Sequence, residues 1–265
     1  MNTPIRTLIL PAAGFGTRMR PVDPNLPKEL LPLGPRRVIE HALLEAADAE
    51  IRTVVVIIRT GKEILRDHLE NCAKRIRIIF VHQDRQTGEG DAIAQAREHA
   101  GSGPFAVLYP DNVGHPAPGM LREVCEAFDR TGKDTVALMR VTPDNAPGIG
   151  NSGRVRLGPP CDKTTLRPIL EFLPKGPGSY PLHNAQEWRT CGLFVTLPHF
   201  FDYIELARQK NLVGELTDGK IRRVMLAQGV EFFGCPLART VFDVGNPTGY
   251  AGLNALLEDS EPAIF

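Results

Sequence analysis

The sequence predicts a three-layer α/β fold in which a mostly parallel sheet carries helices on both faces. Strand and helix patterns alternate through the first half of the 265-residue chain, which is typical of βαβ units with right-handed crossovers. An apolar, largely β-branched run fills residues 53–58, as expected of a strand buried on both faces. A glycine-containing loop follows the first strand, and ligands of such sheets bind beyond the carboxyl ends of the strands.

The elements are expected in the following order. The first strand begins at Thr7, and further strands are predicted at 53–58, 76–81, 105–109, 135–141, 154–157, 169–172, 188–195, 230–233 and 240–242. Apolar residues at helical spacing, such as Val38, Ile39, Ala42 and Ala46, indicate helices. Helices are predicted at 37–49, 62–72, 90–99, 118–130, 198–209, 217–228 and 248–257.

One stretch, residues 143–181, departs from this rhythm because it is rich in glycine and proline. Its two short strands, 154–157 and 169–172, predict an insertion folded over the sheet, where a second ligand would sit. A loop with no binding role is the alternative.

The composition limits the classes of partner. Lysine plus arginine equals aspartate plus glutamate, 31 each, so no overall charge favours nucleic acid or a membrane surface. We find no signal peptide and no stretch of membrane-spanning length. The five cysteines are scattered without a C-x-x-C pair, which fits a reducing cytoplasm.

The loop after the first strand has the features of a phosphate-binding site. Gly14 and Gly16 can adopt backbone angles that other residues avoid, and consecutive N–H groups in such a turn bind anions. Arg18 adds a planar donor fork suited to phosphate oxygens. We therefore predict a nucleoside triphosphate site here, formed by Ala12, Ala13, Gly14, Gly16 and Thr17 together with Arg18.

Other interpretations of this loop are weaker. A dinucleotide fingerprint requires a third glycine where Met19 stands, and a P-loop requires lysine after its last glycine, where Thr17 follows Gly16. A glycine-rich surface turn is the remaining alternative. Lys28, which lies between Pro27 and a short apolar segment, favours a nucleotide site that also carries a catalytic lysine.

The two segments G-x-G-T-R-M-x-P and P-K-E-L-L-P-L together resemble the start of the sugar-1-phosphate nucleotidylyltransferases, and most closely the bacterial UTP–glucose-1-phosphate uridylyltransferases. The resemblance implies one Rossmann-like nucleotidyltransferase domain over residues 1–265. Residues 1–142 would bind the nucleotide, and residues 143–265 would hold a small β-rich sugar-binding insertion and the closing strands and helices.

The resemblance also implies roles for residues at other strand ends. Gln83 and Gly88 would read a pyrimidine base, since an amide offers a donor and an acceptor together, although Asp91 stands where the relatives often have histidine. Asp111 and Asp243 each follow an apolar strand and would hold Mg²⁺, a hard cation that takes oxygen ligands. A turn residue or helix cap is the commoner role of a single aspartate.

Fewer residues of this sequence match the sugar-binding residues of the family. Glu171 matches a glutamate that holds sugar hydroxyls, but Phe172 replaces the adjacent lysine that holds the sugar phosphate. We hypothesise that Lys175 takes the phosphate role and that Phe172 packs beneath the sugar or against the core. Gly150 and Gly192 match glycines of the sugar pocket.

The resemblance implies an enzyme that condenses UTP with a sugar 1-phosphate in the presence of Mg²⁺. Glucose 1-phosphate is the first candidate for the sugar phosphate. We expect the enzyme to be a homo-oligomer, either a dimer or a tetramer. Arg18 would neutralise the departing pyrophosphate and Lys28 would contact the α-phosphate. Three alternatives stay open: the same reaction with dTTP or another triphosphate and a different sugar or cyclitol phosphate, a non-catalytic nucleotide-sugar sensor, and an NAD-dependent dehydrogenase.

Overall fold

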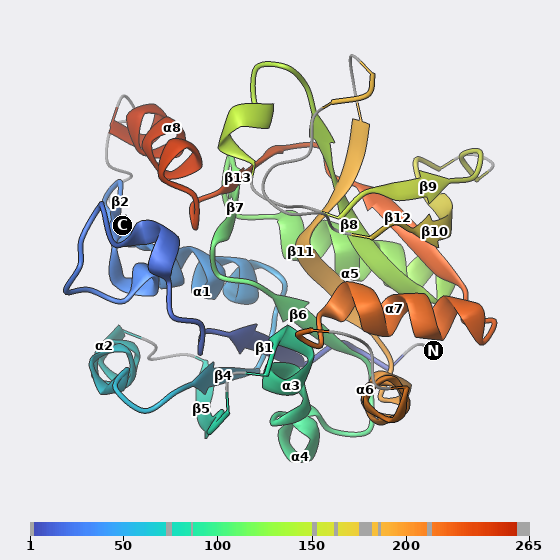
Figure 1. The fold of residues 1–265 in the computed structure, drawn as a ribbon, viewed down its shortest axis with the longest axis horizontal. Helices are drawn as coiled ribbons and strands as arrows, with labels where there is room; N and C mark the ends of the chain where they lie inside the picture. The colour runs from blue at the N-terminus through green and yellow to red at the C-terminus, as the bar shows by residue number, and fades with distance from the viewer. Residues whose placement is uncertain are drawn as a thin grey trace.

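A nine-stranded sheet in the order β5-β4-β1-β6-β11-β8-β12-β10-β9 forms the centre of the protein (Figure 1). The structure, a computed structural model, describes residues 3–72, 76–85, 87–149, 153–161, 164–174, 182–184, 187–210 and 214–258. The strands of the sheet are β1 Thr7–Pro11, β4 Thr53–Ile58, β5 Arg77–His82, β6 Phe105–Leu108, β8 Asp134–Val141, β9 Val155–Leu157, β10 Arg167–Phe172, β11 Glu187–Thr196 and β12 Phe232–Pro236.

Most of these strands are parallel, which confirms the prediction. β5, β4, β1 and β6 pair in parallel, as do β8 and β12. β11 lies antiparallel between β6 and β8, and β10 lies antiparallel between β12 and β9. The sheet therefore directs the carboxyl ends of β1, β5 and β6 to one edge.

Helices cover both faces of the sheet. Because successive residues of a strand point to opposite faces, each strand contributes side chains to two buried clusters. Val54 and Val56 of β4 pack with α1 Val38–Asp48, α2 Glu63–Cys72 and α5 Met120–Thr131 in one buried cluster. Val55 and Ile57 belong to the cluster on the other face. That cluster includes residues of α3 Glu89–Ala94, α4 Arg97–Ala100, α6 His199–Gln209 and α7 Asp218–Ala227.

Smaller elements surround one end of the sheet. β7 Asn112–His115 pairs with β13 Thr240–Asp243, and β2 Pro32–Leu33 pairs with β3 Arg36–Arg37. A third buried cluster joins Met19 and Val113 to Leu253 of α8 Pro247–Glu258. Short 3₁₀ turns complete the chain: η1 Thr17–Met19, η2 Lys28–Leu30 and η3 Ala146–Gly148. No helix in the described ranges has the length and apolar character needed to cross a bilayer.

The structure differs from the sequence prediction in a few elements. The helix predicted at 90–99 is two short helices, α3 and α4, and the strand predicted at 230–233 begins at Phe232. The two strands predicted within the insertion are β9 and β10, and they extend the main sheet through β12. The short strands β2, β3 and β7 were not predicted, since two to four residues leave no clear period.

The start of α6 is fixed to β8 through a buried carboxylate. Asp134 accepts hydrogen bonds from the hydroxyl of Thr196 and, at 2.8 Å, from Nε2 of His199. The hydrogen bond to Asp134 and the charges of Asp134 and Asp202 raise the pKa of His199 above its ordinary value, against a smaller opposing effect of burial. The protonated imidazole is therefore the form that the fold stabilises.

This raised pKa predicts a stability that depends on pH. The His199 contribution is fully present below the unfolded-state pKa, about 6.5, and is lost as pH rises through the higher folded-state pKa. The free energy of unfolding should therefore differ more between the wild type and His199→Gln at about pH 6 than at about pH 8.5. Urea unfolding at both pH values measures this. A difference that is the same at both would contradict it.

Candidate active site

A cavity of about 440 Å³ opens beyond the carboxyl ends of β1, β5 and β6. This is the edge at which parallel α/β sheets bind ligands. Most of the residues predicted for the site line it: Ala13, Gly14, Gly16, Thr17, Arg18, Lys28, Gln83, Gly88, Asp111, Gly192 and Asp243. Residues from six separate segments of the chain therefore meet in one pocket.

The glycine loop forms one wall of this pocket. Gly16 has φ 64° and precedes the 3₁₀ turn η1, so a side chain there would be strained. A Cβ on Gly16 would lie 3.4 Å from Cγ of Lys28, whereas a Cβ on Gly14 would have no atom within 4 Å. The loop thus leaves open space beside Gly14, and the missing side chain of Gly16 lets Lys28 lie close to the loop.

Behind the loop lies a buried ion pair that the sequence did not suggest. Nζ of Lys62 lies 2.8 Å from Oε2 of Glu29 and donates a hydrogen bond of 2.5 Å to the carbonyl oxygen of Ala12. Both side chains are at most 3% exposed. Ala12 therefore contributes its backbone, from behind the loop, and does not line the cavity.

Lys28 forms an ion pair with Asp111. Burial alone would lower the pKa of Lys28, but the charges of Asp111 and Glu29 and the hydrogen bond to Asp111 raise it above its ordinary value. Burial would raise the pKa of Asp111, yet the charge and hydrogen bond of Lys28, with the charge of Arg18, lower it. Both groups are therefore charged at neutral pH.

The carboxylates of Asp111 and Asp243 lie close together. β7 and β13 pair Asn112 with Asp243, and the N–H of Val244 donates a 2.8 Å hydrogen bond to the carbonyl of Asp111. A Cβ on Gly245 would lie 2.5 Å from Oδ2 of Asp111 and 3.1 Å from Oδ1 of Asp243. Arg18 lies 3.6 Å from Asp243. Two neighbouring carboxylates that open into a cavity fit a hard divalent cation.

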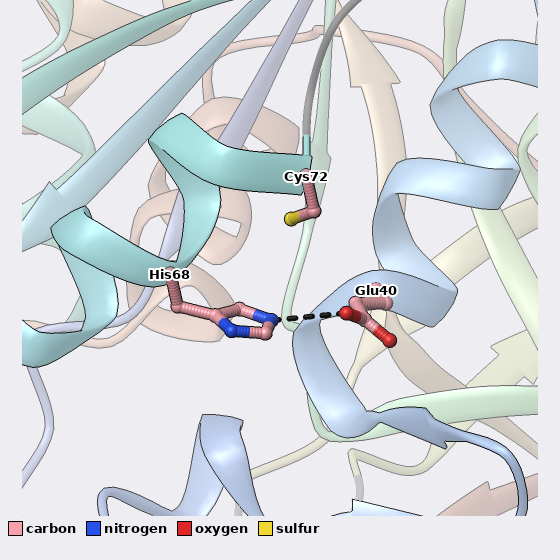
Figure 2. A group of neighbouring side chains, drawn as sticks. All are labelled: Glu40, His68 and Cys72. Carbon is pink, nitrogen blue, oxygen red and sulfur yellow. Dashed lines mark hydrogen bonds and ion pairs between the residues drawn. The ribbon is translucent and has the colours of Figure 1, made fainter.

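Another group with ligand-type side chains lies on α1 and α2: Glu40, His68 and Cys72 (Figure 2). Oε1 of Glu40 lies 3.0 Å from Nε2 of His68, and its Oε2 accepts a 2.8 Å hydrogen bond from the N–H of Arg37 at the start of α1. Both oxygens of Glu40 are thus engaged in joining and capping helices. None of the three residues lines the cavity.

Gln83 and Gly88 lie together in a second wall. Gln83 is buried, and its Nε2 donates a 3.2 Å hydrogen bond to the carbonyl of Gly88. Gly88 has φ 127°, and a Cβ there would lie 2.6 Å from the carbonyl oxygen of Leu216. Only glycine allows this approach between the loop and the segment before α7.

The residues predicted for sugar binding are separated. Gly192 lines the cavity with φ 67°, and a Cβ there would lie 2.8 Å from Tyr109. Glu171 does not line the cavity; its carboxylate is half exposed and pairs with Arg156 at 3.1 Å. Gly150 and Lys175 lie outside the described residues.

Several cavity residues were not predicted from the sequence, among them Tyr109, Asp218 and Arg222. The one feature of the sequence that could have indicated two of them is the i,i+4 spacing of Asp218 and Arg222 on a predicted helix, because this spacing suits an ion pair.

Phe172 packs in the core, which was one of the two hypotheses for this residue. It is buried, and its ring lies 5.0 Å from that of Phe232.

The fold and the cavity are those of an α/β protein that binds its ligand beyond the carboxyl ends of the strands. The family model for nucleotidyl transferases matches residues 6–260, and the chain belongs to this family. It is 30% identical to a UTP–glucose-1-phosphate uridylyltransferase of Mycoplasma pneumoniae, over 94% of this chain and 91% of the relative. It is also 30% identical to UTP–glucose-1-phosphate uridylyltransferase 2 of Staphylococcus saprophyticus, over 93% and 89%.

Solved structures support the same fold. A UDP-glucose pyrophosphorylase complexed with UDP-glucose has a TM-score of 0.78 at 22% identity, covering 95% of this chain and 98% of that one. An inositol-1-phosphate CTP transferase from T. maritima has a TM-score of 0.73 at 13% identity, covering 98% and 99%. At these identities the likeness concerns the fold alone.

Gly245 provides a test of the carboxylate pair. Gly245→Ala should push Asp111 away from Asp243, because the new Cβ would meet Oδ2 of Asp111 at 2.5 Å. We expect weaker Mg²⁺ binding by calorimetric titration, with an unchanged circular dichroism spectrum. Gly252→Ala is the control, since its Cβ would approach only Phe242, at 3.8 Å. Equal Mg²⁺ affinity in both variants would rule out the pair as the metal site.

Proposed function

We propose that the protein condenses UTP with a sugar 1-phosphate, glucose 1-phosphate being the first candidate, to give a UDP-sugar and pyrophosphate. The observation that carries this proposal is the meeting of Arg18, Lys28, Asp111 and Asp243 beside a glycine loop in one cavity. The names of the relatives with 30% identity support the choice of substrates.

The chemistry requires no general base. A phosphate monoester has a second pKa near 6, so the sugar phosphate is already a dianionic nucleophile at neutral pH. One of its oxygens attacks the α-phosphorus of UTP; a new P–O bond forms as the bond to the β-phosphate oxygen breaks, and pyrophosphate leaves. The barrier then depends on positioning and on charge stabilisation.

Two cations of the chain fit these requirements. Lys28 remains protonated beside Asp111 because of its raised pKa, and its ammonium would reduce the repulsion between the two phosphate groups. Arg18 would bind the departing pyrophosphate. Asp111 and Asp243 would hold Mg²⁺, which would neutralise charge on the phosphate oxygens.

The remaining contacts are assigned by position. The loop from Ala12 to Thr17 would hold the nucleotide, and Gln83 and Gly88 would face the base. Gly192 would line the sugar site, together with Gly150 and Glu171 as the resemblance implies and with Lys175 as we hypothesise for the sugar phosphate. Glu171 would have to leave Arg156 to reach a sugar.

A second assignment keeps the reaction and changes the substrates, with dTTP or another triphosphate and a different sugar or cyclitol phosphate. One of the solved neighbours is an inositol-1-phosphate CTP transferase, which uses a different triphosphate and a cyclitol phosphate. We also infer a reducing cytoplasm as the location, since the cysteines are free thiols. The homo-oligomer stays a prediction.

Pyrophosphate release across a grid of triphosphates and sugar 1-phosphates tests the proposal. We expect turnover to be highest with UTP and glucose 1-phosphate in the presence of Mg²⁺. EDTA should abolish turnover and added Mg²⁺ should restore it, because phosphate oxygens and aspartates both bind this cation. Nucleotide-sugar binding without turnover of any pair would instead identify a sensor.

Lys28→Ala should lower kcat by about 10²-fold or more, as for the loss of one preorganised donor that stabilises charge. The variant should remain folded by circular dichroism, because Lys28 lies on the wall of the cavity and not in the hydrophobic core. Lys133→Ala is the matched control, since Lys133 lies at the surface and pairs with Glu231. Turnover like that of the wild type in a steady-state assay would exclude the catalytic assignment of Lys28.

A further inference from the structure

The wall of the cavity contains a buried polar cluster formed by Tyr109, Asp218 and Arg222. All three line the cavity, and Arg222 is 3% exposed as a whole residue. Nη2 of Arg222 donates a 2.5 Å hydrogen bond to Oδ2 of Asp218, one helical turn earlier on α7. Neither the glycine loop nor the carboxylate pair contributes to this cluster.

Two aromatic rings hold the guanidinium in place. Its central carbon lies 4.7 Å from the ring centroid of Phe194 and 5.4 Å from that of Phe172. Cation–π contacts of this length are favourable and are stronger in a buried setting. The ring at Phe172 therefore supports a cation from α7, at the position where the resemblance implies a lysine.

The cluster contains hydrogen-bonding groups that no described protein atom satisfies. Nε and Nη1 of Arg222 and the hydroxyl of Tyr109 are buried without a partner. A buried donor without an acceptor costs about 1–3 kcal/mol, so native proteins rarely keep three of them together. Because they occur on the wall of a ligand cavity, a ligand with oxygen atoms is the natural source of their partners.

The charges around the cluster select the kind of ligand. The charge of Arg222 is balanced by Asp218, and Glu89 and Glu215 also line the cavity. A second anion would meet these carboxylates, whereas neutral hydroxyl groups can accept from Arg222 and exchange hydrogen bonds with Tyr109.

We propose that Tyr109 and Arg222 form a subsite that hydrogen-bonds the hydroxyl groups of the sugar in the sugar 1-phosphate substrate. Asp218 is a positioning residue that orients the guanidinium, and Phe172 and Phe194 fix its plane. The subsite rests on the proposed transferase function and adds to it the residues that distinguish one sugar from another. The base is left to Gln83 and Gly88, and the phosphates to Lys28 and Arg18.

Two conservative variants test this subsite. Tyr109→Phe removes one hydroxyl, and Arg222→Lys keeps the charge beside Asp218 but loses the planar donor fork. Each should raise KM for glucose 1-phosphate by about tenfold, which corresponds to about 1.4 kcal/mol, and leave KM for UTP unchanged. The controls are Tyr203→Phe and Arg223→Lys, which alter the same residue types on α6 and α7 outside the cavity.

A series of monodeoxy glucose 1-phosphates identifies the contact directly. If Tyr109 binds one hydroxyl, the penalty of Tyr109→Phe should disappear for the analogue that lacks this hydroxyl and persist for the others. A penalty that is equal for every sugar, a change confined to KM for UTP, or no change in a folded variant would overturn the subsite. Melting temperatures establish folding. A wild type that turns over no sugar phosphate would overturn the transferase proposal and the subsite together.

Discussion

The active end of the molecule depends on the buried ion pair between Lys62 and Glu29. Lys62 comes just before α2, Glu29 lies in η2, and the carbonyl that Lys62 also contacts belongs to Ala12 after β1. Burial lowers the pKa of Lys62, and Glu29 opposes this effect. Removing one partner of such a pair leaves a buried charge and typically costs about 3–5 kcal/mol. The pair therefore fixes the glycine loop and the Lys28 segment relative to each other.

The Lys62–Glu29 ion pair also helps to hold the charged side chains of the cavity in position. Lys28 is adjacent to Glu29 in the chain and pairs with Asp111, while Arg18 pairs with Asp243. In both pairs a cationic side chain thus has a carboxylate as its neighbour on the wall of the cavity. A nucleoside triphosphate would bring negative charge and a divalent cation would bring positive charge. The lysine and arginine could then pair with the phosphates and the aspartates with the cation, so that no charge would be left unbalanced in a partly buried site.

The sequence predicted the parts of the site that are encoded locally. Runs of β-branched residues marked the strands, and residues directly after them, such as Gln83 and Asp111, converged because parallel strands end at one edge. Glu29 and Lys62 were missed because charged residues are usually exposed, and Tyr109 and Arg222 because only the tertiary fold brings the end of β6 and helix α7 to the same cavity. The burial pattern of β10 accounts for another difference: Phe172 is buried and its neighbour Glu171 is exposed, in a strand whose register shifts between Ile169 and Glu171.

The charged residues beside the glycine loop and the polar cluster on α7 therefore follow different physical rules. Close to phosphate groups positive charge must be supplied, and Arg18 and Lys28, which would supply it, match the motif shared with the nucleotidyl transferases. At the proposed sugar subsite, the balanced Asp218–Arg222 pair replaces the net positive charge of a lysine at position 172, and its unmet donors can be satisfied by neutral hydroxyls. Because these residues come from α7 and not from the glycine loop, substitutions there can alter the choice of sugar while the chemistry at phosphorus is retained.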